Sequence, residues 1–473
     1  MIKTAITDMY GIKYPIICGA MMWLGKPDLT AAVSNAGGMG TLTAAIYPTA
    51  EEWRSAIRET HKLTDKPFLA SITFLPAFNT TVDHFKPYVK ACIEGGVAGI
   101  EVSGQPMDTA IGQQYVDMLK DAGVKLFHKV GSVRHAVHCQ KVGYDGVYAA
   151  GFEEGGHPLS DDVTTMTLTP RIREEVDLPI ITVGGISNGR SLAAALSLGG
   201  DGVMMATRFM ATRECKIHAR IKQELRDRQE RDTTLVCKTL HLQARALRNK
   251  LIEQVLEMEE RGTDLFELMP LITGKNALEA WQTGDVDVGM MTVGQSIGLI
   301  HDEPTIAELL ERMVSEARER LAWAQYALNS PEPVGEEISL AEEESVDELA
   351  PADAEEEITP VKPEPAPVPE PLPTMSFEEA TRGITGIVGD DCGIPRIVKL
   401  DLGEAGVIII DGNATPNTVT NQDQEADIIA KLSLANLGLI IGGSLSSQTA
   451  FMNGEMAIEG DMAVALKVAG LLG

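Results

Sequence analysis

The sequence predicts an α/β protein in which a (β/α)8 TIM barrel fills the first 330 residues and a separate α+β domain follows at the C-terminus. Two observations support the barrel. Eight short apolar segments alternate with helical stretches, and each segment is almost continuously apolar, as strands are when both faces of a parallel sheet are covered. An acidic, proline-rich stretch then interrupts the pattern and separates the two domains.

Each of the eight repeating units begins with a predicted strand. These strands cover residues 15–22, 39–45, 68–75, 99–104, 125–131, 146–151, 179–185 and 202–208. The helical stretches between them include residues 50–63, 108–122, 133–142 and 189–198. Eight such units close into a barrel more readily than they form an open sheet. An open doubly wound sheet is the alternative, but no strand leads into the G-x-G-x-x-G turn that would favour it.

The charge of the chain is unevenly distributed. The 473 residues carry a formal net charge of −28, and residues 331–374 contain fourteen Asp and Glu against one Lys. This segment is also rich in proline, so we expect an extended linker between residues 1–330 and residues 375–473. The acidic balance argues against a nucleic-acid or anionic-membrane partner, which would require a basic face.

The six cysteines are scattered and include no C-x-x-C pair, so we expect neither a disulfide framework nor a metal site. The N-terminus lacks the apolar region of a signal peptide. No apolar run approaches the ~18 residues that suggest a membrane span. A soluble, cytoplasmic protein is the prediction.

The candidate catalytic residue is His157, which ends the motif Gly-Phe-Glu-Glu-Gly-Gly-His after the sixth predicted strand. Gly151, Gly155 and Gly156 let the backbone approach a bound group closely because they have no Cβ. An imidazole can exchange a proton near neutral pH. Barrel enzymes place their chemistry at this end of the strands. The alternative is a glycine-rich turn with an incidental surface histidine.

Strands seven and eight both end in small residues. Gly184 and Gly185 follow the seventh strand, and Met205, Ala206 and Thr207 end the eighth. Many barrels bind phosphate at this place, through backbone N–H groups and a helix N-terminus. A phosphorylated cofactor lying across the barrel mouth would place its ring near His157 and the loop after the first strand.

Five motifs in order resemble the FMN-dependent nitronate monooxygenase family, formerly called 2-nitropropane dioxygenase, to which bacterial flavin-dependent enoyl-ACP reductases are closely related. The motifs are Pro-Ile-Ile-Cys-Gly-Ala-Met from residue 15, Asn-Ala-Gly-Gly-Met-Gly from 35, the glycine motif that ends at His157, Val-Gly-Gly-Ile-Ser-Asn-Gly from 183 and Gly-Val-Met-Met-Ala-Thr-Arg-Phe from 202. The resemblance covers about residues 5–320.

The resemblance implies FMN as the cofactor and His157 as the catalytic histidine beside the flavin. The residues it implies around FMN are Ala20, Met21, Met22, Thr73, Lys129, Gly151, Gly155, Gly156, Gly184, Gly185, Met205, Ala206, Thr207, Gln295 and Ser296. The chain departs from many relatives at Glu154, where a small residue is usual, and again just after His157. These departures put activity on small nitronates in doubt.

Other candidate residues have structural interpretations. His135 and His138 are predicted to lie on a helix outside the barrel, without enough ligands for a metal. Cys18 is expected to be a small apolar wall residue, because no basic neighbour would activate it. Lys129 is expected to contact the flavin, since a lysine on a buried strand needs a partner. Residues 215–261 are interpreted as helices packed over the barrel, with no chemical role.

The C-terminal part has its own pattern. Predicted strands cover residues 393–402, 405–410 and 424–430, residues 432–441 form a helix or loop, and an apolar helix covers residues 463–472. The order resembles the sterol carrier protein-2 domain, whose Phe-Met-x-Gly and Ile-x-Gly-x-Met elements stand at residues 451–454 and 458–462. The resemblance implies a tunnel for an apolar acyl or sterol-like ligand. The alternative is a small domain that only mediates assembly.

Together these features predict an FMN-dependent oxidoreductase that oxidises a small-molecule nitronate or another substrate with an acidic C–H bond, with dioxygen as the second substrate. If the C-terminal domain delivers the substrate to the barrel, we expect that substrate to be lipid-like. One alternative is an NAD(P)H-dependent enoyl-thioester reductase, and another is a lipid carrier whose barrel is inactive. A homo-oligomer is left open.

Overall fold

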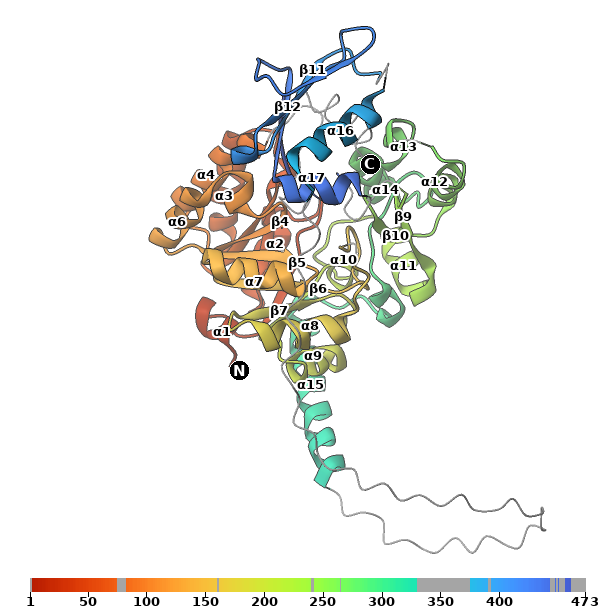
Figure 1. Cartoon of the computed structure of the whole chain (residues 1–473). Helices are drawn as coiled ribbons and strands as arrows, with labels where there is room; N and C mark the ends of the chain where they lie inside the picture. Colours follow the sequence, from red (N-terminus) through yellow and green to blue (C-terminus); the bar gives the residue numbers. More distant parts are fainter. Residues whose placement is uncertain are drawn as a thin grey trace, which may run out of the picture.

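The barrel consists of eight parallel strands surrounded by helices (Figure 1). The computed structural model describes residues 2–74, 82–159, 161–239, 242–263, 265–329, 375–389, 393–442, 447, 450 and 456–460. The barrel strands are β1 (Ile16–Cys18), β2 (Gly40–Thr43), β3 (Phe68–Phe74), β4 (Gly99–Gly104), β5 (Lys125–Val130), β6 (Gly146–Ala150), β7 (Ile180–Val183) and β8 (Gly202–Met205).

Strand order follows chain order from β2 to β8, and β8 then pairs in parallel with β1. A further parallel bridge joins Ile17 to Met39 and brings β1 beside the start of β2. The predicted barrel is therefore confirmed, and the open-sheet alternative is wrong. The eighth strand ends earlier than predicted because a short helix begins at Thr207.

Most helices of the barrel part cover its outer face. The helices are α1 (Ala5–Tyr10), α2 (Pro27–Asn35), α3 (Ala50–Leu63), α4 (Lys86–Gly95), α5 (Met107–Ala110), α6 (Gln113–Asp121), α7 (Val133–Val142), α8 (Thr165–Glu175), α9 (Gly189–Ser197) and α10 (Thr207–Met210), with short 3-10 turns at Ala44–Ile46 and Val82–Phe85. α1 instead packs Ile6 and Tyr10 against the inner side chains of the strands and so closes one end of the barrel. The predicted helix over residues 108–122 is split into α5 and α6, because Gly112 adopts φ of 105° between them.

Alternating side chains of the strands form two apolar layers. Phe127 and Tyr148 pack inside the barrel, whereas Leu126 and Val147, one position away, pack outward against the helices. This alternation follows from the period of two in a strand. The strands therefore contribute side chains to both layers, which explains why their sequences are almost continuously apolar.

The segment after β8 contains a β-hairpin as well as helices, so the helical interpretation of residues 215–261 is correct at both ends of this range and wrong in its middle, where the hairpin lies. Its elements are α11 (Ala219–Asp227), a 3-10 turn (Glu230–Asp232), β9 (Thr233–Val236), β10 (Ala244–Leu247), α12 (Lys250–Glu260), α13 (Leu265–Ile272), α14 (Gly274–Thr283), a 3-10 turn (Gln295–Leu299) and α15 (Ile306–Asn329). β9 and β10 pair antiparallel. The Thr-Thr-Leu-Val sequence of β9 favours a strand, since β-branched side chains fit a pleated surface.

The C-terminal part forms a five-stranded sheet in the order β13-β12-β11-β14-β15. Its elements are α16 (Phe377–Val388), β11 (Ile397–Asp401), a 3-10 turn (Gly403–Ala405), β12 (Val407–Asp411), β13 (Thr418–Thr420), β14 (Ile428–Leu432), α17 (Leu434–Ile441) and β15 (Met456–Gly460). The sheet and its two helices enclose an apolar core that shares no residue with those of the barrel. This confirms a separate α+β domain.

Three predicted C-terminal strands have counterparts in β11, β12 and β14, and α17 decides between the helix and the loop that the sequence left open. α16, β13 and β15 correspond to no predicted helix or strand. The predicted linker at 331–374, the motif at 451–454 and the helix at 463–472 lie outside the described residues.

Candidate active site

A cavity of about 780 Å³ opens at the C-terminal ends of the barrel strands. Its wall also includes residues of the β9–β10 hairpin, α13 and α14. Fourteen of the sixteen predicted site residues line this cavity: Ala20, Met21, Met22, Thr73, Lys129, Gly155, Gly156, His157, Gly184, Gly185, Met205, Ala206, Thr207 and Ser296. The barrel thus brings together residues that are far apart in the sequence.

Gly151 and Gln295 do not line the cavity but support the loops that do. A Cβ on Gly151 would lie 2.1 Å from Thr165 Oγ1, so only glycine lets this loop pack against the start of α8. The backbone N–H of Gln295 donates to the Glu153 carbonyl at 3.0 Å. The structure therefore gives both residues contacts behind the cavity wall, unlike the direct cofactor contacts that the sequence predicted.

The hairpin fixes the loop that carries His157. The backbones of Gly156 and Arg245 exchange two hydrogen bonds, of 3.1 and 2.6 Å, and the Arg245 guanidinium donates to the Phe152 carbonyl at 3.0 Å. Arg245 itself is buried. Cys237, just after β9, lies in the cavity wall. The sequence interpretation missed this function of the hairpin, because it assigned no role to residues 215–261.

A buried ion pair lies beside His157. Lys129 Nζ donates to Glu154 Oε1 at 2.9 Å and to the His157 carbonyl at 3.0 Å. These contacts use two of the three N–H donors of the Lys129 ammonium group, and Lys129, which was expected to contact a flavin, also lines the cavity. Burial raises the pKa of the Glu154 carboxyl, and Lys129 opposes that shift. The pair joins β5 to the glycine loop, and this explains why an acidic residue at position 154 is tolerated here.

The imidazole of His157 has exposed surface, and His157 lines the cavity. Desolvation by the surrounding protein, followed by the charge of Lys129, lowers the pKa of His157 to about 4. Because this shift favours the uncharged ring, His157 is neutral near pH 7.

The two glycines after β7 form an open backbone surface. Gly184 and Gly185 have φ of 100° and 72°, in the region that favours glycine. A Cβ on Gly185 would meet no atom closer than 3.9 Å, so its space faces the cavity. On the neighbouring strand end, Thr207 Oγ1 accepts a hydrogen bond from the Gly294 N–H at 3.0 Å. We call Gly184, Gly185, Ala206 and Thr207 the cradle.

The sequence analysis did not select Glu101, although it lies in the cavity wall and is 3% exposed. Ser103 Oγ donates to its Oε1 at 3.0 Å, and its Oε2 has no hydrogen-bond partner among the described residues. The signal in the sequence is an acidic residue inside an apolar strand, close to its C-terminal end.

Methionines are numerous around the cavity. Those in the wall are Met21, Met22, Met204, Met205, Met210, Met269 and Met290. Methionine is flexible and polarisable, so it adapts to apolar ligands of different shapes.

A hydrogen bond connects α14 to the loop after β1. The Trp23 indole donates to the Gly274 carbonyl at 2.7 Å and so holds the start of α14 against this loop.

Cys18, His135 and His138 are the residues to which the sequence analysis assigned structural roles. Cys18 is buried, and desolvation raises the pKa of its thiol, in line with an unreactive wall residue. His138 on α7 pairs with Asp108 at 3.0 Å, whereas His135 on the same helix reaches the cavity wall. Within the described parts of the chain, no three His, Cys, Asp or Glu side chains gather as a metal site would require.

The strand ends, the cavity and the ionisable groups around it define the class of protein: this is a (β/α)8-barrel enzyme. Residues 3–316 match the model of the nitronate monooxygenase family, and the chain belongs to that family. Its barrel is accordingly an oxidoreductase of a flavin-dependent family. Residues 389–473 match the model of the SCP-2 sterol transfer family, as the sequence predicted.

Two curated relatives illustrate the range of this similarity. A probable nitronate monooxygenase of Staphylococcus saprophyticus is 29% identical over 67% of this chain and 98% of its own length. A (3aS,4S,5R,7aS)-5-hydroxy-7a-methyl-1-oxo-octahydro-1H-indene-4-carboxyl-CoA dehydrogenase of Rhodococcus jostii is 30% identical over 68% of this chain and 97% of its own.

Among solved structures, FabK from Thermotoga maritima is 32% identical, with a TM-score of 0.62. The match covers 69% of this chain and all of FabK. The similarity therefore spans the barrel and leaves the C-terminal domain aside. Within the described residues, no helix combines the length and apolar composition needed to cross a bilayer.

Proposed function

We propose that the barrel binds FMN at its mouth and oxidises a carbon acid, either a preformed nitronate or a substrate with an acidic C–H bond, with dioxygen as the final electron acceptor. The observation that carries the proposal is a neutral histidine in the wall of the same cavity as an open glycine surface. Similarity to nitronate monooxygenases supports the choice of substrate class.

The residues of the cradle fit a phosphate group. Gly185 leaves space at its Cα atom, and Ala206 and Thr207 begin a helical turn on the adjacent strand end. Gly184 is packed more tightly, because a Cβ there would lie 2.9 Å from Thr165 Oγ1. Backbone N–H groups in such an arrangement attract anions. Ala20, Met21 and Met22, on the loop after β1, would border the ring of the cofactor. When bound, FMN supplies a two-electron acceptor, and the protein supplies position and electrostatics.

The downward pKa shift of His157 favours one of two roles for its ring. A ring that is neutral at pH 7 carries one N–H donor and one free nitrogen. As a base it would be weak, because efficient proton transfer needs a pKa near the working pH. As a donor it can hydrogen-bond an anionic nitronate oxygen or the anion that forms when a C–H bond ionises. We therefore assign His157 chiefly to stabilising the substrate anion.

A second candidate is an NAD(P)H-dependent enoyl-thioester reductase. The similarity to FabK and to a carboxyl-CoA dehydrogenase favours it. The methionine-rich cavity wall would also accept a larger apolar substrate than a small nitronate.

Anaerobic flavin reduction distinguishes the two candidates. The purified chain is mixed with alkyl nitronates, acyl-CoA thioesters or NAD(P)H, and loss of the flavin absorbance is followed by stopped flow. Rapid bleaching by nitronates supports the proposal. Bleaching by NAD(P)H alone, followed by reoxidation with enoyl thioesters, would establish the reductase instead. A colourless protein that takes up no FMN would favour a lipid carrier with an inactive barrel.

For the C-terminal domain we propose an acyl or sterol-like ligand, on the strength of its similarity to the SCP-2 family. We further propose the division into a barrel at 1–330, a linker at 331–374 and a lipid-binding domain at 375–473. In this arrangement the tail would retain apolar molecules near the barrel, whose own chemistry would remain independent of it.

A further inference from the structure

The last helix of the barrel part, α15, packs directly behind the cradle. The cradle glycines lead within a few residues into α9, and Thr207 opens α10. A Cβ on Gly189, the first residue of α9, would lie 2.3 Å from Glu316 Cβ and 2.4 Å from the Met313 carbonyl. Glycine at this position therefore allows α9 to contact α15 at its backbone.

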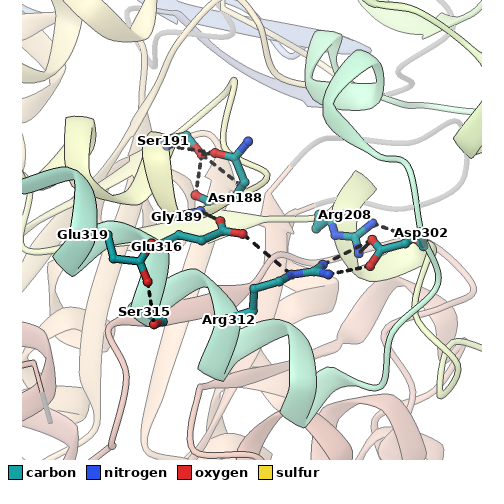
Figure 2. Close-up of polar contacts among 9 residues, drawn as sticks. All are labelled: Asn188, Gly189, Ser191, Arg208, Asp302, Arg312, Ser315, Glu316 and Glu319. Carbon is teal, nitrogen blue, oxygen red and sulfur yellow. Dashed lines mark hydrogen bonds and ion pairs between the residues drawn. The ribbon is translucent and has the colours of Figure 1, made fainter.

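A chain of charged groups connects the two sides of the cradle through α15 (Figure 2). Arg208, next to Thr207, donates from its guanidinium to Asp302 Oδ1 at 2.7 Å and to the Asp302 carbonyl at 3.1 Å. Arg312 donates to the same carboxylate at 2.5 and 3.2 Å. The Arg312 Nε lies 3.9 Å from Glu316 Oε1, and Glu316 Oε2 accepts the Gly189 N–H at 2.8 Å.

Only Arg208 is buried in this chain of charges, because the other three side chains are between 38% and 45% exposed. Arg208 is 2% exposed, and desolvation lowers the pKa of its guanidinium, while Asp302 opposes that shift. Hydrogen bonding from Arg312 lowers the pKa of Asp302, so Asp302 remains ionised. An unpaired buried charge is costly. Arg208 therefore follows the position of Asp302, and Arg312 holds that position from α15.

We infer that α15 and the segment before it position the cofactor site: Asp302, Arg312 and Glu316 hold the two sides of the cradle at the separation that fits the phosphate of FMN. The inference rests on the proposed placement of FMN. None of these three residues lines the cavity, so they act through Arg208 and Gly189 as positioning residues. Binding groups must be held to within about 0.5 Å of their productive geometry. Loss of a residue that supports the cradle should therefore cause a measurable loss of FMN affinity.

The test compares FMN with riboflavin, which lacks the phosphate. Full-length chains carrying Asp302→Ala or Glu316→Ala are stripped of flavin and titrated with each ligand by flavin fluorescence. We expect FMN affinity to fall about tenfold, the loss that corresponds to roughly 1.4 kcal/mol. Riboflavin affinity should change less than twofold. Glu316→Gln should restore much of the FMN affinity, because its amide oxygen can still accept the Gly189 N–H.

Glu319→Gln is the matched control on the same helix. Glu319 accepts a hydrogen bond from Ser315 at 3.2 Å, away from the chain of charges (Figure 2), and its substitution should leave both affinities unchanged. Circular dichroism checks folding. If an alanine variant unfolds, Asp302→Asn replaces it, because it keeps the side-chain shape but removes the charge that pairs with Arg208 and Arg312, and the same loss of FMN affinity is expected.

Three results would overturn the inference. Equal weakening of both ligands would indicate general destabilisation, and unchanged FMN affinity would show that the chain of charges has no influence. A wild-type chain that binds FMN and riboflavin equally would refute the phosphate site itself, and the inference with it.

Discussion

Gly185→Asp tests the position of the cofactor phosphate most directly. The change adds a carboxylate to the cradle at a site where the new Cβ meets no atom within 3.9 Å, so steric conflict is small. The backbone angle φ of 72° costs a residue with a side chain about 1–2 kcal/mol, although Asp and Asn tolerate this region better than most. Strain alone should therefore leave a folded barrel.

The electrostatic cost is larger. A phosphate with a charge of about −1.5 to −2 that lies ~5 Å from the new carboxylate would be repelled by roughly 5 kcal/mol at an effective dielectric constant of about 20. Even a third of this value would weaken FMN binding by about tenfold. We expect Gly185→Asp to purify largely without flavin.

Gly185→Asn is the matched control, because it adds nearly the same shape and a similar backbone strain without the charge. It should purify yellow. The assay is the ratio of flavin to protein absorbance after purification, followed by FMN titration of the stripped chain and a thermal melt. Full flavin content in the Asp variant, or equal loss in both variants, would refute the electrostatic reasoning and the assignment of the cradle.

Three further changes test the roles of His157, His128 and the linker. His157→Ala should retain FMN yet slow flavin reduction by about 100-fold, measured by stopped flow, and an unchanged rate would remove His157 from the mechanism. Burial lowers the pKa of His128 from 6.5 to about 3, so its neutral ring gives stability that is complete above pH 6.5 and is lost as the pH falls. The unfolding free energy of the wild-type chain should therefore fall between about pH 7.5 and pH 5, and in His128→Gln this fall should be smaller by about 2 kcal/mol. Urea titrations at the two pH values measure the difference, and equal falls in both chains would refute the prediction. Cutting the chain near Pro360 should preserve turnover of small substrates and reduce turnover of dilute long-chain ones, because the tether gives the tail a millimolar effective concentration. Equal long-chain turnover before and after the cut would exclude delivery by the tail.

Local sequence patterns were sufficient for the barrel, because each strand and helix carries its own periodicity. The bounds of α3 and α7 match the prediction, and each begins after a capping residue, Thr49 or Ser132. The split between α5 and α6 was missed because it depends on one backbone angle at Gly112. The hairpin was missed because charged and polar residues surround its strands. Which of its side chains are buried is determined by tertiary packing and cannot be recognised from the local sequence pattern.

The sequence allowed us to predict site residues that are required for their backbone conformation. It was less informative for residues whose role depends on contact with a side chain elsewhere in the chain. The glycines at 184 and 185 both have positive φ, and Gly185 also leaves space at the cavity wall; a pair of glycines after a strand is evident in a sequence. The partner of Lys129 was not evident, because Glu154 comes from a different strand end. The same limit applies to Glu101, whose significance depends on burial.

The segment that follows β8 shapes the site although it lies outside the repeating pattern. The hairpin holds the loop of His157 through Gly156 and Arg245. Asp302, before α15, contacts Arg208, and Glu316 on α15 contacts Gly189, so the segments on both sides of the cradle have a support. These supports act from behind the motifs that identify the family. Because those motifs supply the glycines and the histidine without fixing their separation, the geometry of the site depends on the hairpin and on α15 as well as on the motifs.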